Sequence, residues 1–246
     1  MALTPDELTR YDRQIRLPGF GTAGQEKLKR AKVLVAGVGG LGSAVCHYLT
    51  AAGIGRLVIV DADAVELGNL NRQVLHWEAD LGRRKVASAT AKLGQINSTI
   101  EVAGRDVLID PESIDGLVKE VDLIVDALDN FEGRRVLNRA SLKWKIPYIY
   151  GGIHGWTGMV STFIPGQTPC LECVLPQTSP NETIPVLGAT PGVIGCLEVH
   201  EAIKYLTGTG QLLTNRLLIF DGLEMHFHDM TLDKNPDCSV CGLRAG

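Results

Sequence analysis

The chain has 246 residues, of which 45% are hydrophobic and 21% are charged. This composition is typical of a globular protein with a core large enough to fold without disulfides. The formal net charge of −4 at pH 7 excludes the broad basic surface expected for nucleic-acid binding. No apolar run approaches the ~20 residues of a membrane span, and the first residues lack the pattern of a secretion signal. We therefore expect a cytoplasmic protein with no membrane and no nucleic-acid partner.

The first 150 residues predict an alternation of helices and strands. Thr4 and Glu7 form a capping box, and Pro5 stands at the first position of a helix that runs toward Arg13. The further expected elements are helix 23–30, strand 33–38, helix 41–52, strand 56–61, strand 101–102, a helix after Pro111, strand 123–127, helix 131–144 and strand 147–150. Because the strands are continuously apolar, they predict a parallel sheet covered on both faces.

After residue 150 the pattern changes to a mixed or antiparallel extension. Strands are expected at residues 159–164, 217–220 and 226–232, and a helix carries regularly spaced apolar residues from Leu197 to Leu206. Residues 175–192 contain four prolines and little periodicity, which predicts a long loop. Loops of this length are usually functional or mobile.

A glycine-rich turn follows the first expected strand. Its sequence, Gly-Val-Gly-Gly-Leu-Gly, fits the pattern G-x-G-x-x-G through Gly37, Gly39, Gly40 and Gly42. Such glycines permit a tight turn and let backbone N–H groups approach phosphate oxygens at a helix N-terminus. Asp61 comes 19 residues after the last glycine, where a carboxylate can bind ribose hydroxyls. Together these features predict an adenine-nucleotide site and leave NAD and ATP as alternatives.

Three charged residues point away from a dehydrogenase. Arg72 and Lys85 can neutralise the charge that develops on a polyphosphate, and Asp129 can hold Mg²⁺ against it. Hydride transfer needs no such set, whereas attack on an α-phosphate does. Spacing alone leaves open that all three are ordinary surface charges.

Four of the six cysteines form two Cys-x-x-Cys pairs. The pairs are Cys170 with Cys173 and Cys238 with Cys241, and 64 residues separate them. Four thiolates suit a closed tetrahedral zinc site without an open position for catalysis, so the predicted zinc is structural. It would tie the turn at residue 169 to the C-terminal tail. Redox-active dithiols are the alternative.

Taken in order, these motifs resemble the ThiF/MoeB/HesA family, the bacterial relatives of ubiquitin-activating enzymes. The matching segments are residues 11–15 (Tyr-Asp-Arg-Gln-Ile), 37–42, 69–73 (Asn-Leu-Asn-Arg-Gln), Gly82 with Lys85, 126–130 (Asp-Ala-Leu-Asp-Asn) and the cysteine pairs. The resemblance implies an adenylyltransferase that uses ATP to activate the C-terminal glycine of a small β-grasp sulfur-carrier protein ending in Gly-Gly. The acyl-adenylate then receives sulfur, for example from a cysteine desulfurase or a rhodanese-type protein, and becomes a thiocarboxylate.

The resemblance also implies roles for single residues. Four are expected to be catalytic: Arg72, Lys85, Asp129 and Arg13. The first two would hold the phosphates of ATP, and the third would position Mg²⁺. Asp61 would bind the ribose, and Asn69 is also expected at the nucleotide. In the family, the arginine that matches Arg13 reaches into the active site of the other subunit, which implies a homodimer.

The sequence departs from the family at one point. ThiF-like members carry a cysteine after the first zinc knuckle for a covalent link to the activated carrier, whereas residues 174–195 contain none. Cys196 follows directly, near an expected helix N-terminus, and a cysteine there is more often a buried packing group. A reactive thiol whose pKa is lowered by the helix N-terminus is the alternative. We expect the loop over residues 175–192 to cover the incoming carrier tail.

The sequence therefore predicts an α/β fold with a Rossmann-like, mostly parallel, doubly wound sheet and a C-terminal mixed or antiparallel extension clipped by a structural zinc. We expect one domain over residues 1–246, with N-terminal helices (1–30), a nucleotide-binding core (31–150) and a zinc-knuckle and carrier-binding extension (151–246). Three alternative functions stay open. They are an NAD-dependent oxidoreductase, a non-catalytic scaffold and an ATP-dependent tRNA-modifying dehydratase of the same superfamily. The pathway, whether thiamine, molybdopterin or a related one, does not follow from the sequence.

Overall fold

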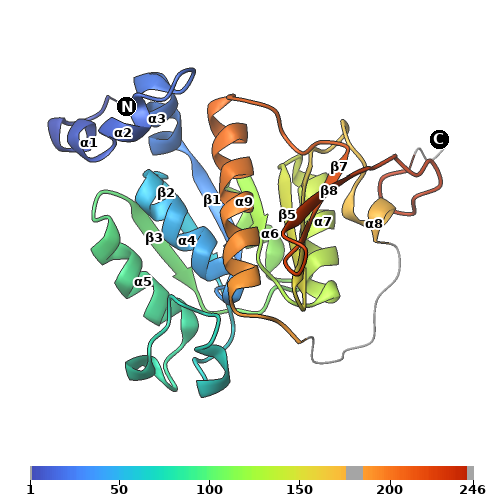
Figure 1. Ribbon diagram of the computed structural model, residues 1–246, viewed down its shortest axis with the longest axis horizontal. Helices are drawn as coiled ribbons and strands as arrows, with labels where there is room; N and C mark the ends of the chain where they lie inside the picture. The colour runs from blue at the N-terminus through green and yellow to red at the C-terminus, as the bar shows by residue number, and fades with distance from the viewer. Residues whose placement is uncertain (1, 176–184, 243–246) are drawn as a thin grey trace.

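The computed structural model describes residues 2–175 and 185–242. Within these ranges the strands are β1 (Lys32–Ala36), β2 (Arg56–Val60), β3 (Glu101–Arg105), β4 (Leu123–Asp126), β5 (Tyr148–His154), β6 (Thr157–Phe163), β7 (Arg216–Asp221) and β8 (His226–Thr231). They form one sheet in the order β3-β2-β1-β4-β5-β6-β7-β8 (Figure 1). The pairs from β3 to β5 are parallel and those from β5 to β8 are antiparallel. This topology confirms the predicted mostly parallel α/β sheet with an antiparallel C-terminal extension.

Helices cover both faces of the parallel part, as the apolar strands require. The helices are α1 (Pro5–Arg10), α2 (Asp12–Ile15), α3 (Gly21–Arg30), α4 (Gly40–Ala52), α5 (Lys85–Ile96), α6 (Ile114–Val118), α7 (Phe131–Trp144), α8 (Leu171–Val174) and α9 (Ala189–Thr207). Alternate residues of β1 serve two cores: Val33 and Val35 pack with α4, α5 and α9, whereas Leu34 packs with α6 and α7. Figure 1 shows α4 and α9 side by side across one face of the sheet.

The N-terminal helix is shorter than predicted. Its capping box is confirmed, because Glu7 N donates to Thr4 Oγ1 over 3.2 Å and Thr4 N donates to Glu7 Oε2 over 2.7 Å. The helix ends at Arg10, and a separate turn, α2, carries Arg13. The break is at Tyr11, whose buried hydroxyl accepts a hydrogen bond of 2.8 Å from Asn97 Nδ2. Burial of this ring therefore sets where the helix ends.

The sequence analysis did not predict α5, and it misplaced the start of α9. Helix α5 begins with a charged residue. Val86, Ala89 and Leu93 are buried at helical spacing, and this apolar pattern could have predicted the helix. The predicted loop over residues 175–192 lies partly outside the described residues, which resume at residue 185. Its end is wrong, because α9 already begins at Ala189. Pro191 lies in the first turn of α9, where the missing N–H of proline removes no helical bond.

None of the described helices combines the length and the apolar character that crossing a membrane would need.

Because α4 packs closely on the turn after β1, a methyl group added at Gly42 should lower the stability of the protein. A Cβ on Gly42 would lie 2.1 Å from the backbone oxygen of Gly37. We expect Gly42→Ala to lower the free energy of unfolding by about 1–3 kcal/mol, because α4 must move away from the turn. Urea denaturation measures this change.

The matched control is Gly94→Ala within α5, where a Cβ would meet no atom within 4 Å. Alanine favours a helix over glycine, so this variant should gain about 0.5–1 kcal/mol. Equal stabilities of the two variants would contradict the packing argument.

Candidate active site and metal centre

A pocket opens at the carboxyl ends of β1, β2 and β4. The chain passes from β1 through β2 to β3 on one side and returns to β4 on the other side of β1. Ligands of open α/β sheets bind at such a switch point. Seven of the predicted nucleotide-site residues line the pocket: Gly37, Gly39, Gly40, Asp61, Arg72, Lys85 and Asp129.

The glycine turn requires glycine at position 37, because the backbone just after β4 leaves no room there for a side chain. Gly37 has φ of +93°, and a Cβ on it would lie 2.6 Å from the backbone oxygen of Ala127. The following N–H, of Val38, donates to Asp61 Oδ2 over 2.8 Å. Asp61 Oδ1 accepts from the N–H of Asp63, also over 2.8 Å. Backbone hydrogen bonds thus hold the Asp61 carboxylate at the pocket wall.

Three helices begin at the pocket. Helix α4 starts after Gly39, α5 starts at Lys85, and α7 starts after Asn130, whose Oδ1 accepts from Gly133 N over 2.8 Å. Helix N-termini carry unpaired N–H groups and partial positive charge. The pocket therefore suits a ligand with several negative charges.

Two cations lie in the same pocket. Arg72 Nη1 donates to Gly68 O and to Asn71 Oδ1, each over 2.9 Å. The side chain of Lys85 is only 6% exposed, and its Nζ lies 2.9 Å from Oδ2 of Asp63, which is 71% exposed. Because that partner is mostly solvated, Lys85 can exchange it for a phosphate oxygen at small cost.

Asp129 is a second exposed carboxylate of this pocket, besides Asp63. It follows β4 and directly precedes α7, and its Oδ1 lies 3.5 Å from Asn130 Nδ2. A buried ion pair fixes the chain beside it: Arg134 Nη2 donates to Leu128 O over 2.6 Å, and Arg134 Nε lies 3.4 Å from Asp126 Oδ2. Asp126 Oδ1 in turn accepts from Leu128 N over 3.0 Å. The loop that carries Asp129 is therefore rigid, while its carboxylate is open to a cation.

Two residues expected at the nucleotide do not line the pocket, and neither does Arg13, which was expected to act in the active site of the other subunit. Gly42 lies behind the turn and permits the close packing of α4. The Oδ1 of Asn69 accepts from Glu66 N over 3.0 Å and caps a short 3-10 turn over Leu67–Asn69. Arg13 is exposed on α2, which precedes the amino end of β1, whereas the pocket lies at the carboxyl end.

Gln73 is a pocket residue to which the sequence analysis assigned no role. It is 5% exposed and lies beside Gly39. Its Oε1 has no hydrogen-bond partner among the described residues. A buried amide oxygen without a partner is uncommon, so we expect a bound ligand or water to donate a hydrogen bond to it. Only its place next to Arg72 in the chain signalled it.

A second buried group without partners lies on α9. Glu198 is fully buried, and its carboxyl group packs so closely on β5 that a Cβ on Gly151 would lie 2.5 Å from it. Neither carboxyl oxygen has a hydrogen-bond partner among the residues described. Burial raises the pKa of Glu198 well above its ordinary value. Burial therefore favours the protonated, neutral form of this side chain.

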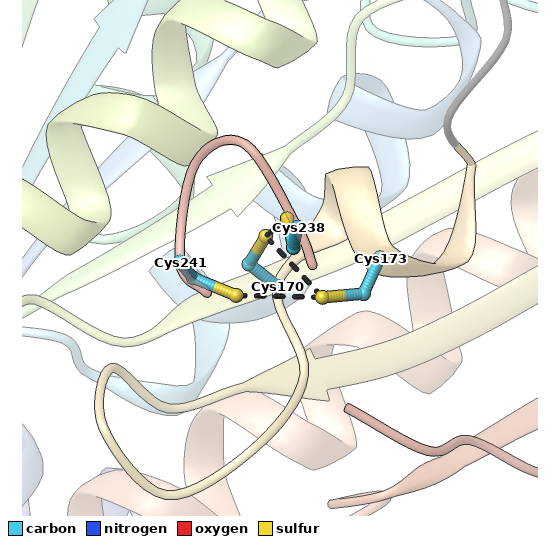
Figure 2. Close-up of side chains that lie close together, drawn as sticks. All are labelled: Cys170, Cys173, Cys238 and Cys241. Atoms are coloured by element: carbon cyan, nitrogen blue, oxygen red, sulfur yellow. Dashed lines mark hydrogen bonds between the residues drawn. The ribbon is translucent and has the colours of Figure 1, made fainter. Parts of the chain in front are cut away.

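The predicted cysteines come together. The Sγ atoms of Cys170, Cys173, Cys238 and Cys241 all lie within 4.8 Å of one another (Figure 2). Three of their separations are 3.9 Å (170 to 173), 3.8 Å (170 to 238) and 3.3 Å (173 to 241). Four thiolates at Zn–S distances of about 2.3 Å lie roughly 3.8 Å apart, so the cluster has the size of a tetrahedral metal site.

The surroundings of the cluster prepare it for a metal. Asn138 of α7 accepts from Leu171 N over 3.1 Å through its Oδ1 and holds the first knuckle. Burial raises the pKa of the Cys238 thiol, but hydrogen bonds from the backbone of Cys241 and Val240 and from the other two cysteines of the cluster outweigh it and lower this pKa to about 7. Burial raises the pKa of Cys170 and of Cys241. A thiolate is the form that binds metal.

The expected place of Cys196 near a helix N-terminus is wrong. It lies in the middle of α9, two turns from the helix start, and burial raises its pKa. The start of α9 was placed too late in the sequence, which moved this cysteine close to the expected N-terminus. Cys46 is fully buried in α4, where burial likewise raises its pKa. Burial therefore disfavours the thiolate form at both positions.

The neutral state of Glu198 predicts a pH-dependent effect of Glu198→Gln. Because the folded-state pKa is raised, the unfolded chain releases this proton first, and wild-type stability falls as pH rises through the interval between the two pKa values. Glutamine has no proton to release. We expect the stability of the variant relative to wild type to increase as the pH rises above the ordinary glutamate pKa of about 4.3, as urea denaturation can measure.

Glu201, one turn later on α9, provides the matched control. Its Oε2 accepts from Thr162 Oγ1 over 2.6 Å and from Leu213 N over 2.7 Å, and its Oε1 contacts Lys204. Glu201→Gln should lose about 1–3 kcal/mol, because it removes a hydrogen-bonded buried charge. If the effect of Glu198→Gln on the free energy of unfolding did not change with pH, that result would contradict a protonated Glu198 in the folded protein.

Comparison with known proteins agrees with this geometry. The sequence model of the ThiF family matches residues 11–240. A sulfur carrier protein adenylyltransferase of Thermus thermophilus is 40% identical, over 98% of this chain and 93% of that protein. A SAMP-activating enzyme E1 of Haloferax volcanii is 38% identical, over 98% of this chain and 92% of that protein. The crystal structure of E. coli MccB with ATP superposes with a TM-score of 0.86 at 28% identity, over 95% of this chain and 73% of that one. The chain belongs to the ThiF family.

Proposed function

We propose that the chain is an ATP-dependent adenylyltransferase that activates the C-terminal glycine of a small β-grasp sulfur-carrier protein. The observation that carries this proposal is the pocket, in which the glycine turn, two cations and an exposed carboxylate meet three helix N-termini. Family membership supports it, since relatives that match over nearly their whole length are named as adenylyltransferases or as an activating enzyme.

The proposed reaction requires positioning and charge neutralisation more than proton transfer. The carrier carboxylate is itself the nucleophile, attacks the α-phosphorus of ATP and expels pyrophosphate, so no strong general base is needed. Two anions must approach each other, which Arg72 and Lys85 make possible by neutralising phosphate charge. The Asp61 carboxylate, already held by two backbone N–H groups, keeps acceptor capacity for the ribose hydroxyls.

Asp129 fits a magnesium ligand. It is exposed, stands on a rigid loop and lies in the same pocket as Arg72 and Lys85. Carboxylate oxygens together with phosphate oxygens are the usual ligands of Mg²⁺. The bound ion would supply Lewis-acid stabilisation of the phosphate charge.

The same pocket argues against the oxidoreductase alternative. A dinucleotide-binding turn needs the glycines and the acid after the second strand, and both are present. It does not need a buried lysine in the same pocket, which Lys85 provides. The residues that a non-catalytic scaffold would be expected to lose are also retained.

We infer a homodimer from the position of Arg13. This exposed side chain lies beyond the amino end of β1, so the pocket of its own chain is at the far edge of the sheet. A second copy can bring the same arginine to the pocket. We assign no particular carrier, sulfur donor or pathway. We also propose a cytoplasmic location, which suits six cysteines that form no disulfide in the described part of the chain.

We also propose that the four-cysteine cluster binds one structural zinc ion. Four sulfurs fill a tetrahedral site, so the ion would join α8 to the C-terminal loop and take no part in the reaction (Figure 2).

Zinc content tests the metal assignment. We expect about one zinc ion per chain that survives dialysis, and Cys238→Ser should lose it, because three sulfurs hold zinc far more weakly. Cys196→Ser is the control, since Cys196 lies outside the cluster, and it should keep its zinc. Elemental analysis measures the content. Equal zinc in both variants, or none in the wild type, would contradict the assignment.

ATP–pyrophosphate exchange tests the activity. We expect exchange with Mg-ATP and one member of a panel of β-grasp proteins that end in Gly-Gly. Arg72→Ala and Asp129→Ala should lower the rate by about 10²-fold or more, because each removes charge stabilisation in the pocket.

Arg139→Ala is the control for that experiment. Arg139 is an exposed arginine of α7 that lies 3.5 Å from Glu172 and does not line the pocket. This variant should exchange at the wild-type rate. Exchange that persists in the two pocket variants would contradict the assigned roles, and NAD binding in preference to ATP would favour the oxidoreductase.

A further inference from the structure

A chain of buried hydrogen bonds supports the glycine turn from behind. His76 Nε2 lies 2.9 Å from Val38 O, and His76 Nδ1 lies 2.9 Å from Ser88 Oγ. Lys92 Nζ lies 2.9 Å from the same Ser88 Oγ. His76 is 3% exposed, Ser88 is fully buried, and Lys92 is 8% exposed. None of these three side chains lines the pocket.

Each partner fixes the direction of its bond. The Val38 carbonyl can only accept, so Nε2 of His76 must carry a hydrogen. Burial, together with the positive charges of Lys92 and Lys85, lowers the pKa of His76 and keeps the ring neutral. The Nδ1 atom is then an acceptor, which takes the hydroxyl hydrogen of Ser88. Lys92 can only donate, and the Ser88 oxygen accepts from it.

The orientation of one peptide group follows from this chain. The carbonyl of Val38 and the N–H of Gly39 belong to the same trans peptide, so they point in opposite directions. With the carbonyl bound to His76, the N–H of Gly39 points away from the buried histidine, and Gly39 lines the pocket. In the described part of the chain no acceptor bonds to this N–H.

Without His76 this peptide could rotate. Glycine adopts positive and negative φ angles about equally well, so a flip of the peptide before Gly39 meets little steric resistance at that residue. A flipped peptide would present a carbonyl oxygen to the pocket, where it would repel a phosphate. The N–H of Val38 is fixed separately by Asp61, over 2.8 Å.

We propose that His76 is a positioning residue of the nucleotide site, which holds the Val38–Gly39 peptide so that the Gly39 N–H faces a phosphate oxygen. The inference rests on the proposed function, since it needs a nucleotide in this pocket. His76 does not touch the ligand and acts only through the peptide.

The test compares a ligand with phosphates and one without. His76→Leu removes the donor to Val38, and we expect it to weaken Mg-ATP binding roughly tenfold while the binding of adenosine stays the same. His76→Gln is the conservative variant, because its Nε2 can still donate to the carbonyl, and it should restore most of the affinity. Calorimetric titration gives both dissociation constants, and urea denaturation establishes that each variant is folded.

Ser88→Ala provides a second variant should His76→Leu fail to fold. It keeps the ring but removes the hydroxyl that holds the ring through Nδ1, and it should weaken Mg-ATP binding in the same ligand-selective way, by about threefold. Equal losses for Mg-ATP and adenosine would show a merely structural role and overturn the inference. So would unchanged Mg-ATP affinity in folded His76→Leu. Wild-type protein that binds neither ligand would instead contradict the proposed function itself.

Discussion

The site depends on how closely the turn after β1 approaches the backbone of its neighbours. A side chain at Gly37 would meet the carbonyl of Ala127 in the adjoining strand connection, and one at Gly42 would meet the turn itself. Because both positions are glycines without a side chain, α4 starts directly above the end of the sheet and its unpaired N–H groups face the pocket. Asp61 and Asp129 are brought to opposite walls of the pocket by the same register of β1 between β2 and β4.

Helix α7 joins the two candidate centres of the molecule. Its first turn carries Arg134, which holds the loop of Asp129 through Leu128 O. One turn further, Asn138 holds the first cysteine knuckle through Leu171 N. The cysteine cluster is therefore connected to the pocket through one rigid helix. The zinc that we propose would stabilise this framework from a distance and leave the reaction to the pocket residues.

The parts that the sequence predicted are those with a local signal. Continuous apolar runs predicted β1, β2 and β4, the glycine pattern predicted the turn, and the spacing of the cysteines predicted their cluster. The remaining features depend on distant contacts. Burial of Tyr11 ends the first helix early. The start of α9 was missed because the first turn of this helix contains a proline. Glu198 and His76 gave no local signal, and Gln73 gave only its place next to Arg72. Folding alone reveals which buried polar groups have partners and which have none.

The central claim is that ATP binds at the glycine turn with its phosphates toward Arg72 and Lys85. A crystal structure of the protein with Mg²⁺ and a non-hydrolysable ATP analogue tests it most directly. The account predicts phosphate oxygens at the backbone N–H groups of Gly39 and Gly40, the ribose at Asp61 and the metal at Asp129. A nucleotide bound elsewhere, or bound here with its phosphates directed away from the turn, would contradict it.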